Sequence, residues 1–395
     1  MRSVFVDTGG RLLTCGRYSS GRVGLLGHAV NPAADPDILR EIGSPTPVPS
    51  MQDRRIVSVA TSDLHCLALG AEGEVYSWGD GECGELGHGD VDAKAVPSRI
   101  ESLSRIERIA AGQNRTSAAV DEKGRLFTWG RASFFDANTY LRGFRKTSHG
   151  PSGLGYELDS EIFFQPTPKR VDALSQDRVV GVALGTGFTL TVADASAVFS
   201  CGFCRHGSLG HGSWESEVLP RRIQALAETG LRFIAVAAGN SHALALTEEG
   251  RVYGWGGEEA NRHGREECMP HRVAALIGQR VKLVNAKDDS SCAVLGEGGL
   301  FTWGHSRGEG GLGHGNDAPQ QFEPKRVEGL KGVEVAAVAV GWTHTLAADA
   351  DGVVWAFGRR SALGLDASGP HPQFRARVLT PTLISTLRVR VLNSP

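Results

Sequence analysis

The 395-residue sequence lacks the features that would place a protein in a membrane or on a charged polymer. It has no run of eighteen apolar residues, so we expect no membrane-spanning helix. Its 42 basic and 44 acidic residues leave a formal charge of -2, which gives no overall field to gather nucleic acid or anionic lipid. The N-terminal stretch reaches a glycine pair and charged residues too early for the apolar core of a secretory signal, so we do not expect export.

Cysteine is also scarce, and the number of cysteines is odd. An odd and scattered set does not form a disulfide framework and suits a reducing compartment. We therefore expect a cytoplasmic or nuclear protein whose stability does not depend on disulfide bonds. The seven cysteines are Cys15, Cys66, Cys83, Cys201, Cys204, Cys268 and Cys292.

Glycine is the residue present in excess, with 52 copies against 7% aromatics, which predicts many tight turns between short strands. One six-residue phrase, such as EVYSWG or RLFTWG, occurs seven times and ends in glycine each time. These glycines recur at intervals of 48 to 72 residues. They are Gly16, Gly79, Gly130, Gly202, Gly256, Gly304 and Gly358.

Two further phrases flank each copy after the first, so each unit contains four predicted strands. Before the phrase stand two short apolar runs joined by a turn, as in FIAVA and ALAL around Gly239 to His242. After it, beyond a variable loop, comes a proline followed by apolar residues, as at Pro97 and Pro168. Proline cannot donate to a strand ladder, so it belongs at the start or edge of a strand.

Seven units of this length predict an all-β protein: one seven-bladed β-propeller of four-stranded blades spanning residues 1-395. The first unit begins at Val4 to Val6 without the strand that precedes this position elsewhere, and a spare strand, Leu387 to Val391, follows the last unit. We expect the N- and C-terminal strands to pair in one composite blade, which closes the ring and removes two sheet edges. An open solenoid would instead need polar caps at both ends.

The chain resembles the regulator-of-chromosome-condensation repeat family over nearly its whole length, because all three phrases occur in order. The family's Leu-Gly-His-Gly turn is visible at Leu86 to Gly89 and, in whole or in part, in three other units. The Gly-x-x-His-Thr turn is intact at Gly341 to Thr345. The resemblance implies a propeller fold shared by an exchange factor for the small GTPase Ran, a plant ultraviolet-B photoreceptor and many scaffolds, and the fold alone does not choose among them.

Several motifs have structural explanations beside their functional ones. In the photoreceptor, the chromophore tryptophans lie in repeated turns, whereas here only Trp342 does, which argues against ultraviolet sensing. Cys201 and Cys204 have the spacing of a redox pair, but Cys201 stands where other units carry a buried tryptophan, so we expect packing. The turn histidines occur once per blade, too far apart for a metal site, so we expect no metal. They are His28, His88, His211 and His314.

Five arginines occupy the same position before the apolar residue of the proline phrase. As a ring they could bind acidic partners or phosphates, and as a solvated strand face they would contribute little each. Because acidic residues match basic ones overall, we favour the second interpretation. The five are Arg99, Arg170, Arg222, Arg272 and Arg326.

The largest departure from the repeat is an insertion in the third blade, residues 131-167, and a second long connection, 28-50, is proline-rich. A loop of this length in a compact domain is usually functional, and its mixture of aromatic and basic residues is typical of binding hot spots. The same aromatics could instead fold back onto their own blade. The candidate partner-binding residues are Phe134, Phe135, Asp136, Asn138, Tyr140, Arg142, Phe144, Arg145 and Lys146.

The insertion also raises the question of nucleotide exchange. Ser133 to Asn138 is similar to the stretch after the third Trp-Gly of the Ran exchange factor, which uses acidic residues and a wedge from that blade, and this implies Asp136 as the candidate acid. The family's exchange face also includes a histidine from a later turn, where this chain has Lys287 to Cys292 instead. The match is therefore confined to one short segment.

Together these observations predict a non-enzymatic scaffold that presents propeller-rim loops to protein partners. The alternative is a guanine-nucleotide exchange factor for a Ran-like small GTPase. No phosphate-binding loop, zinc-protease helix or nucleophile elbow occurs in a fitting context, so we expect no enzyme, no cofactor and no small-molecule substrate. We expect protein partners, no membrane and no strong nucleic-acid binding.

Overall fold

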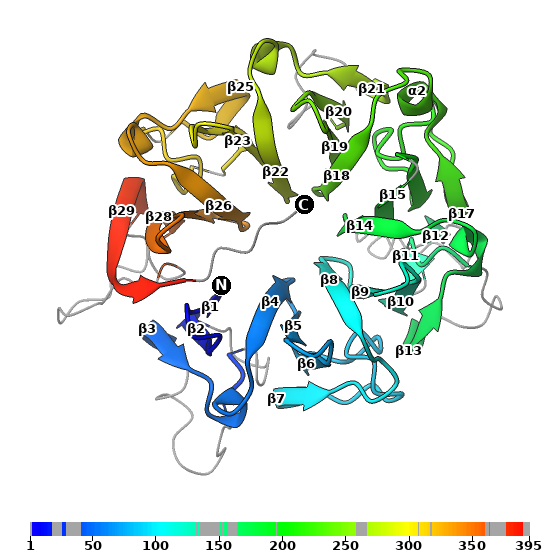
Figure 1. The fold of residues 1–395 in the computed structure, drawn as a ribbon, viewed down its shortest axis with the longest axis horizontal. Coiled ribbons are helices and arrows are strands. Elements are labelled where there is room, and N and C mark those ends of the chain that lie inside the picture. Colours follow the sequence, from blue (N-terminus) through cyan, green and yellow to red (C-terminus); the bar gives the residue numbers. More distant parts are fainter. Residues whose placement is uncertain are drawn as a thin grey trace, which may run out of the picture.

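The computed structural model is a ring of seven blades around a central axis (Figure 1). It describes residues 2–17, 26–28, 41–131, 133–134, 150–151, 153–156, 164–194, 196–257, 267–306, 308–316, 318–359, 363 and 377–389. Six blades are four-stranded antiparallel sheets, and the blade that contains the N-terminal strands has three strands among these residues. The predicted seven-bladed all-β propeller is thus confirmed.

The strands follow the predicted phrases in order. Blade 1 contains β1 (Arg2–Val6), β2 (Leu12–Arg17) and β3 (Glu41–Pro47). Blade 2 contains β4 (Ile56–Thr61), β5 (His65–Gly70), β6 (Val75–Gly79) and β7 (Lys94–Arg99). Blade 3 contains β8 (Ile106–Gly112), β9 (Thr116–Asp121), β10 (Leu126–Arg131) and β13 (Phe164–Arg170). Blade 4 contains β14 (Val179–Leu184), β15 (Phe188–Ala193), β16 (Val198–Gly202) and β17 (Glu217–Arg222).

The remaining blades repeat this order. Blade 5 contains β18 (Phe233–Ala238), β19 (His242–Thr247), β20 (Val252–Gly256) and β21 (Glu267–Arg272). Blade 6 contains β22 (Val281–Lys287), β23 (Ser290–Leu295), β24 (Leu300–His305) and β25 (Gln320–Arg326). Blade 7 contains β26 (Val335–Val340), β27 (His344–Asp349), β28 (Val353–Arg359) and β29 (Arg377–Arg388).

Short helical turns follow the last strands of several blades. One is α2 (Gln224–Ala227), and the others are 3-10 turns: η1 (Pro49–Met51), η2 (Asp172–Leu174), η3 (Ala274–Leu276) and η4 (Glu328–Leu330). Each buries one apolar residue near its end, such as Leu174 or Leu226, against the blades. Among the described residues no helix is long and apolar enough to cross a membrane.

The proline of each fourth strand lies at an irregularity in strand pairing. In blade 2, Ser77 pairs with Ser98 and Gly79 pairs with Lys94, so Pro97 falls inside the register shift. The same shift separates the paired residues of blades 3 to 6. A residue without a backbone N–H loses no ladder hydrogen bond at such a site, which explains the repeated proline.

Blades 3 and 5 pack on the preceding blade through the tryptophan of the repeated phrase. Trp129 of blade 3 is buried and donates from Nε1 to the carbonyl oxygen of Glu85 in blade 2, at 2.9 Å. Trp255 of blade 5 donates in the same way to Ser208 of blade 4, at 2.9 Å. A turn of one blade therefore binds the tryptophan of the following blade. The apolar core is a series of clusters between neighbouring blades.

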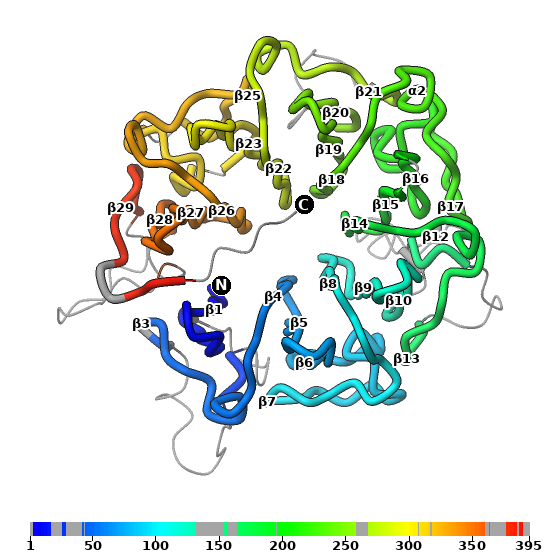
Figure 2. The backbone as a smooth tube through the Cα atoms, viewed as in Figure 1, coloured from blue at the N-terminus to red at the C-terminus, as the bar shows by residue number. Residues whose placement is uncertain are grey.

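The ring closes where blade 7 meets blade 1 (Figure 2). Phe5 and Leu13 of blade 1 share a buried cluster with Ile384 and Leu387 of β29. Asp7 and Val389 form an antiparallel bridge, which is the described part of the pairing between the two ends of the chain.

The position of the spare strand differs from the sequence prediction in one detail. Arg388, expected in the spare strand, pairs with Val353 at the end of β29, and among the described residues of that strand Val389 forms the backbone bridge to blade 1. The bulges in β29 explain the difference, because they lengthen the strand beyond its equivalents in other blades. Residues 390–395 lie outside the described part of the chain.

Candidate functional site

The predicted binding insertion emerges on one end of the propeller, which we call the insertion face. The connections from the first to the second strand and from the third to the fourth strand of every four-stranded blade emerge on this face, because neighbouring strands are antiparallel. The insertion is the third-to-fourth connection of blade 3, between β10 and β13. It therefore shares its face with six first-to-second-strand turns that surround the central axis.

The base of the insertion is a short antiparallel ribbon. β11 (Ser133–Phe134) pairs with β12 (Gly150–Pro151), with Ser133 opposite Pro151 and Phe134 opposite Gly150. Of the nine predicted partner-binding residues, only Phe134 lies in the described part of the chain, and only by its backbone. The other eight lie outside the described residues, namely Phe135, Asp136, Asn138, Tyr140, Arg142, Phe144, Arg145 and Lys146.

The second half of the insertion returns to the repeat pattern. Leu154 is buried, and its carbonyl oxygen accepts a hydrogen bond of 2.6 Å from the Thr128 hydroxyl. Leu86 accepts from Ser77 in the same way at 2.6 Å in blade 2. Tyr156 stands where blade 2 has His88, and its hydroxyl donates to the Thr128 carbonyl at 2.9 Å. The departure from the repeat is thus concentrated between β10 and Gly153.

Sequence reasoning missed this turn because tyrosine replaces the motif histidine. The remaining signal is the Leu-Gly pair at Leu154 and Gly155, since glycine at this position takes a φ of +82°. Leu363, also followed by glycine and also buried, occupies the corresponding turn of blade 7.

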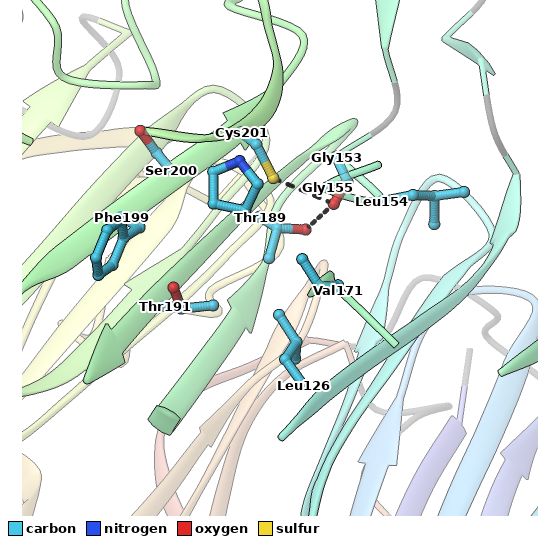
Figure 3. Close-up of a pocket in the computed structure, with 11 residues that line it drawn as sticks. Leu126, Gly153, Leu154, Gly155, Val171, Thr189, Thr191, Phe199, Ser200 and Cys201 are labelled. Carbon is cyan, nitrogen blue, oxygen red and sulfur yellow. Dashed lines mark hydrogen bonds between the residues drawn. The ribbon is translucent and has the colours of Figure 1, made fainter. Parts of the chain in front are cut away.

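A cleft too narrow to hold a water molecule lies between blades 3 and 4, beside this turn (Figure 3). Cys201 occupies the position where blades 2, 3, 5 and 6 carry a tryptophan, and its small side chain leaves this space. The Cys201 Sγ and the Thr189 hydroxyl both contact the carbonyl oxygen of Gly153, at 3.6 and 2.6 Å. Burial raises the pKa of Cys201 to about 12, so the thiol is unreactive at neutral pH and serves in packing.

Polar side chains link the turns at the centre of the insertion face. The Thr186 hydroxyl of blade 4 lies 2.8 Å from Gln113 Oε1 of blade 3 and 2.7 Å from Asn240 Oδ1 of blade 5. Gln113 Nε2 donates to Asp288 Oδ1 of blade 6. The backbone N–H of Asn240 donates to the carbonyl oxygen of Asp288 at 2.6 Å. Four consecutive blades are therefore joined by one hydrogen-bonded network, which we call the axial network.

Asp288 is the strained member of the axial network. Its φ is +51°, a left-handed conformation that is uncommon outside glycine, asparagine and aspartate. Its side chain is buried, and Oδ2 has no hydrogen-bond partner in the described structure. Burial, and next the charge of Asp63, raise the pKa of Asp288 to about 6. The carboxylate is thus held at a site that disfavours its charge.

A cluster of ion pairs between blades 2 and 3 lies on the same face. Arg115, in the first turn of blade 3, pairs with Asp80 at 3.0 Å and with Glu82 and Glu85 at 2.9 Å each. The Glu85 side chain is fully buried, and burial raises its pKa. Because removing one partner from a buried ion pair is costly, this cluster ties the turns of blades 2 and 3 together.

The turn histidines have the structural role expected from the repeat. Nε2 of His88 lies 2.9 Å from the Ser77 hydroxyl, and His211 is 2.9 Å from Ser200. Burial lowers the pKa of His211 to about 4, so the ring is neutral at physiological pH. Within the described ranges, no group of three or more histidine, cysteine, aspartate or glutamate side chains could hold a metal ion.

The five arginines of the proline phrases do not form one site. Each stands opposite an aromatic residue of the third strand of its own blade, as Arg99 does with Tyr76 and Arg222 with Phe199. Two have carboxylate neighbours on the same strand end: Arg170 with Asp172 at 2.5 Å, and Arg99 with Glu101 at 3.5 Å. This arrangement fits a solvated strand face and not a phosphate ring.

Fold and site define a β-propeller that displays an inserted loop beside a polar axial network. Profiles of the regulator of chromosome condensation (RCC1) repeat match residues 72–119, 196–246 and 297–348, and a second profile of the repeat matches residues 56–85 and 233–265. The chain belongs to the regulator of chromosome condensation repeat family.

Curated relatives include proteins of different function. E3 ubiquitin-protein ligase HERC2 of Homo sapiens is 36% identical over 87% of this chain, which corresponds to 6% of that protein. Ultraviolet-B receptor UVR8 of Arabidopsis thaliana is 32% identical over 78% of this chain and 64% of that protein. Protein RCC2 of Homo sapiens is 29% identical over 87% of this chain and 64% of that protein. The chain thus spans less than two thirds of these relatives.

Solved structures show the same fold. Human WBSCR16 matches with a TM-score of 0.76 and 20% identity, over 95% of this chain and 94% of that one. Prp20p from Saccharomyces cerevisiae, described with its binding to Gsp1p and histones, matches with a TM-score of 0.75 and 22% identity, over 96% of this chain and 87% of that one. At these identities the likeness concerns the fold.

Proposed function

We propose that the protein is a non-enzymatic interaction platform whose blade 3 insertion contacts a protein partner. The observation that carries the proposal is the β11–β12 ribbon, which gathers both ends of the inserted segment at one place on the insertion face. The turn beneath it is packed into the ring, because Leu154 is buried and the carbonyl oxygen of Gly153 accepts a hydrogen bond from Thr189 of blade 4. A loop on a rigid scaffold is the usual location of a binding site.

The composition of the inserted segment supports a protein as the ligand. Aromatic and arginine side chains contribute most of the binding energy in protein interfaces. Proteins similar to this chain include an E3 ubiquitin-protein ligase and an ultraviolet-B receptor, and Prp20p, which shares the fold, binds Gsp1p and histones.

The test replaces Phe134, Phe135, Arg142 and Arg145 together by serine or alanine and identifies partners captured from a cell lysate by mass spectrometry. We expect capture to be lost while the melting temperature changes little, since surface substitutions stay within about 0.5 kcal/mol. The matched control is Phe322→Ser, which removes an exposed phenylalanine from blade 6 and should leave capture unchanged.

Two outcomes would contradict the proposal. A variant that is destabilised by several kcal/mol assigns the aromatics to the blade's own core, because buried phenylalanine truncations cost about 3 to 5 kcal/mol each. A stable variant that still captures every partner places the binding surface elsewhere on the ring.

A second candidate function is nucleotide exchange on a Ran-like small GTPase. The specific observation is that the segment similar to the exchange factor begins at Ser133, in the ribbon itself, so Asp136 would follow two residues after β11. The test measures release of fluorescent GDP from Ran. We expect wild-type protein to accelerate release and Asp136→Ala to reduce the rate at least tenfold, which corresponds to about 1.4 kcal/mol. No acceleration by the wild-type protein would exclude this function.

A further inference from the structure

Two hydrogen bonds cross the centre of the ring on the insertion face and join blades that are not neighbours. Gln113 Nε2 of blade 3 donates to Asp288 Oδ1 of blade 6, with blades 4 and 5 between them. Lys287 Nζ of blade 6 donates to the carbonyl oxygen of Thr61 in blade 2 at 2.7 Å, with blades 7 and 1 between them. The strands β4, β8 and β22, which lead into these turns, point toward the axis (Figure 1). We call the two contacts the axial latch.

Both contacts of the axial latch start from one turn of blade 6. This turn connects β22 to β23, and its ends are the paired residues Lys287 and Ser290. Neighbouring blades are joined separately by buried apolar clusters and by contacts such as that of His242 with Ser291, at 2.9 Å. A change confined to this turn can therefore release both latch contacts while the junctions between neighbouring blades stay formed.

Asp288 is held in this turn with one carboxylate oxygen unsatisfied. Its side chain is 6% exposed, Oδ1 accepts a hydrogen bond from Gln113, and Oδ2 has no hydrogen-bond partner in the described structure. Its φ of +51° lies in the left-handed region, which is unfavourable for a residue other than glycine. An ionised carboxylate here has lost its hydration without gaining a full set of hydrogen bonds. The closed turn is therefore less favourable when Asp288 is charged.

The charged groups near Asp288 do not compensate for its burial. Asp63 of blade 2 and the adjacent Asp289 both disfavour the ionised form, and Lys287 favours it. Burial, followed by the charge of Asp63, raises the pKa of Asp288 from 3.8 to about 6. The charges of two carboxylates on opposite sides of the axis thus oppose the closing of the turn.

The other blades add no further charge beside this carboxyl group. Gln113 of blade 3 and Asn240 of blade 5 contribute an uncharged amide side chain and a backbone N–H, respectively. In blade 7, burial lowers the pKa of His344 to about 4, so its ring is neutral at pH 7.5. Asp288 is thus the group whose charge changes between acid and neutral pH in this turn.

An open turn that returns Asp288 to water would restore its ordinary pKa of 3.8. Because the closed turn binds the proton more tightly than the open one, opening becomes easier as the pH rises. The difference is absent below pH 3.8 and complete above pH 6. Acid therefore favours the closed turn, and neutral pH favours its opening.

We propose that the axial latch is a pH-sensitive switch. It stays closed while Asp288 is protonated, and the turn of blade 6 opens locally, with the ring still folded, when Asp288 is ionised. This inference goes beyond the proposed function, because it concerns the centre of the insertion face and needs neither the insertion nor a partner.

The experiment measures amide hydrogen exchange of the full chain at pH 5 and pH 7.5, corrected for the intrinsic exchange rates. The reporter is the N–H of Asn240, which donates to the carbonyl oxygen of Asp288 at 2.6 Å. We expect its protection factor to be roughly tenfold lower at pH 7.5, as the shift in pKa requires. The N–H of Val179, bonded to the carbonyl oxygen of Gly124 at the other end of the propeller, should keep its protection.

Three variants separate the causes of this effect. Asp288→Asn keeps the group uncharged and should give Asn240 the same protection at both pH values. Asp63→Asn removes the facing charge and should make the pH effect smaller, with Asp288 left in place. The matched control is Asp92→Asn, at an exposed carboxyl of the same blade as Asp63, which should show the pH effect of the wild type.

Three results would overturn the inference. Equal protection of Asn240 at both pH values in the wild type would show that the turn does not open when Asp288 ionises. A pH effect of equal size at Val179 would assign the change to unfolding of the whole ring. A pH effect that persists in Asp288→Asn would assign it to another group, and an unchanged effect in Asp63→Asn would remove the role of the facing charge.

Discussion

At the residue scale, the sequence predicted the roles of side chains at positions that recur in every blade. It missed the roles of side chains at positions that differ from blade to blade. The buried tryptophans and the packing of Cys201 follow from position within the phrase, because every blade needs an apolar residue there. Gln113, Thr186 and Asp288 occupy turns that differ from blade to blade, so no pattern brings them together. Only the closed ring places them around one axis.

Asp288 gives a prediction about stability and pH. A carboxyl group whose pKa in the folded state is raised from 3.8 to about 6 destabilises the fold when it ionises. The resulting loss in the free energy of unfolding is absent below pH 3.8 and complete above pH 6. Asp288→Asn should therefore raise the free energy of unfolding at pH 7.5 by roughly 2 kcal/mol. Asparagine tolerates the positive φ and keeps an oxygen for Gln113.

The measurement is urea unfolding of both proteins at pH 7.5 and at pH 4. We expect the advantage of Asp288→Asn to shrink at the lower pH, where the wild-type carboxyl is protonated in the fold. Asp92→Asn, at an exposed carboxyl in blade 2, serves as the control for the loss of a surface carboxyl group. An equal gain at both pH values would show that charge is not the cause.

At the element scale, strands were predictable and connections were not. Proline and glycine marked the fourth strand and the end of the third, because each has a conformational property that the pairing requires. The insertion was found as a departure in length, but its return to the repeat at Leu154 was hidden by Tyr156. Its partner-binding residues stay a prediction.

The turn of blade 3 that contains Leu154 and Tyr156 gives two predictions about stability. Tyr156→Phe removes the hydrogen bond to the Thr128 carbonyl and should cost about 1 kcal/mol. Leu154→Ala should cost about 2 to 5 kcal/mol, since the side chain is buried between blades. Both should retain partner capture when folded, measured by denaturant unfolding and the lysate assay. A Leu154→Ala protein as stable as the wild type would show that this turn does not support the insertion.

At the scale of the whole molecule, ring closure combines contacts from both ends of the chain. His344 of blade 7 lies with Nε2 3.2 Å from the hydroxyl of Ser3 in blade 1. The same contact joins His65 to Ser117 and His242 to Ser291 in neighbouring blades, at 2.8 and 2.9 Å. The seam thus reproduces an ordinary junction between blades, although blade 1 has three strands among the described residues.

Removing the C-terminal seam contacts should destabilise the entire ring. Deletion of residues 387–395 removes Leu387 from the seam cluster and Val389 from its bridge to Asp7 and its 2.9 Å hydrogen bond to Gly352. We expect the free energy of unfolding to fall by at least about 3 kcal/mol, because the deletion removes a buried leucine and exposes a strand edge. Deletion of 390–395 alone keeps these contacts and serves as the control. Both melting temperatures are measured by calorimetry. If the longer deletion melts at the same temperature as the wild type, the seam contacts do not hold the ring closed. The contacts between blades that are consecutive in the sequence would then be sufficient for stability.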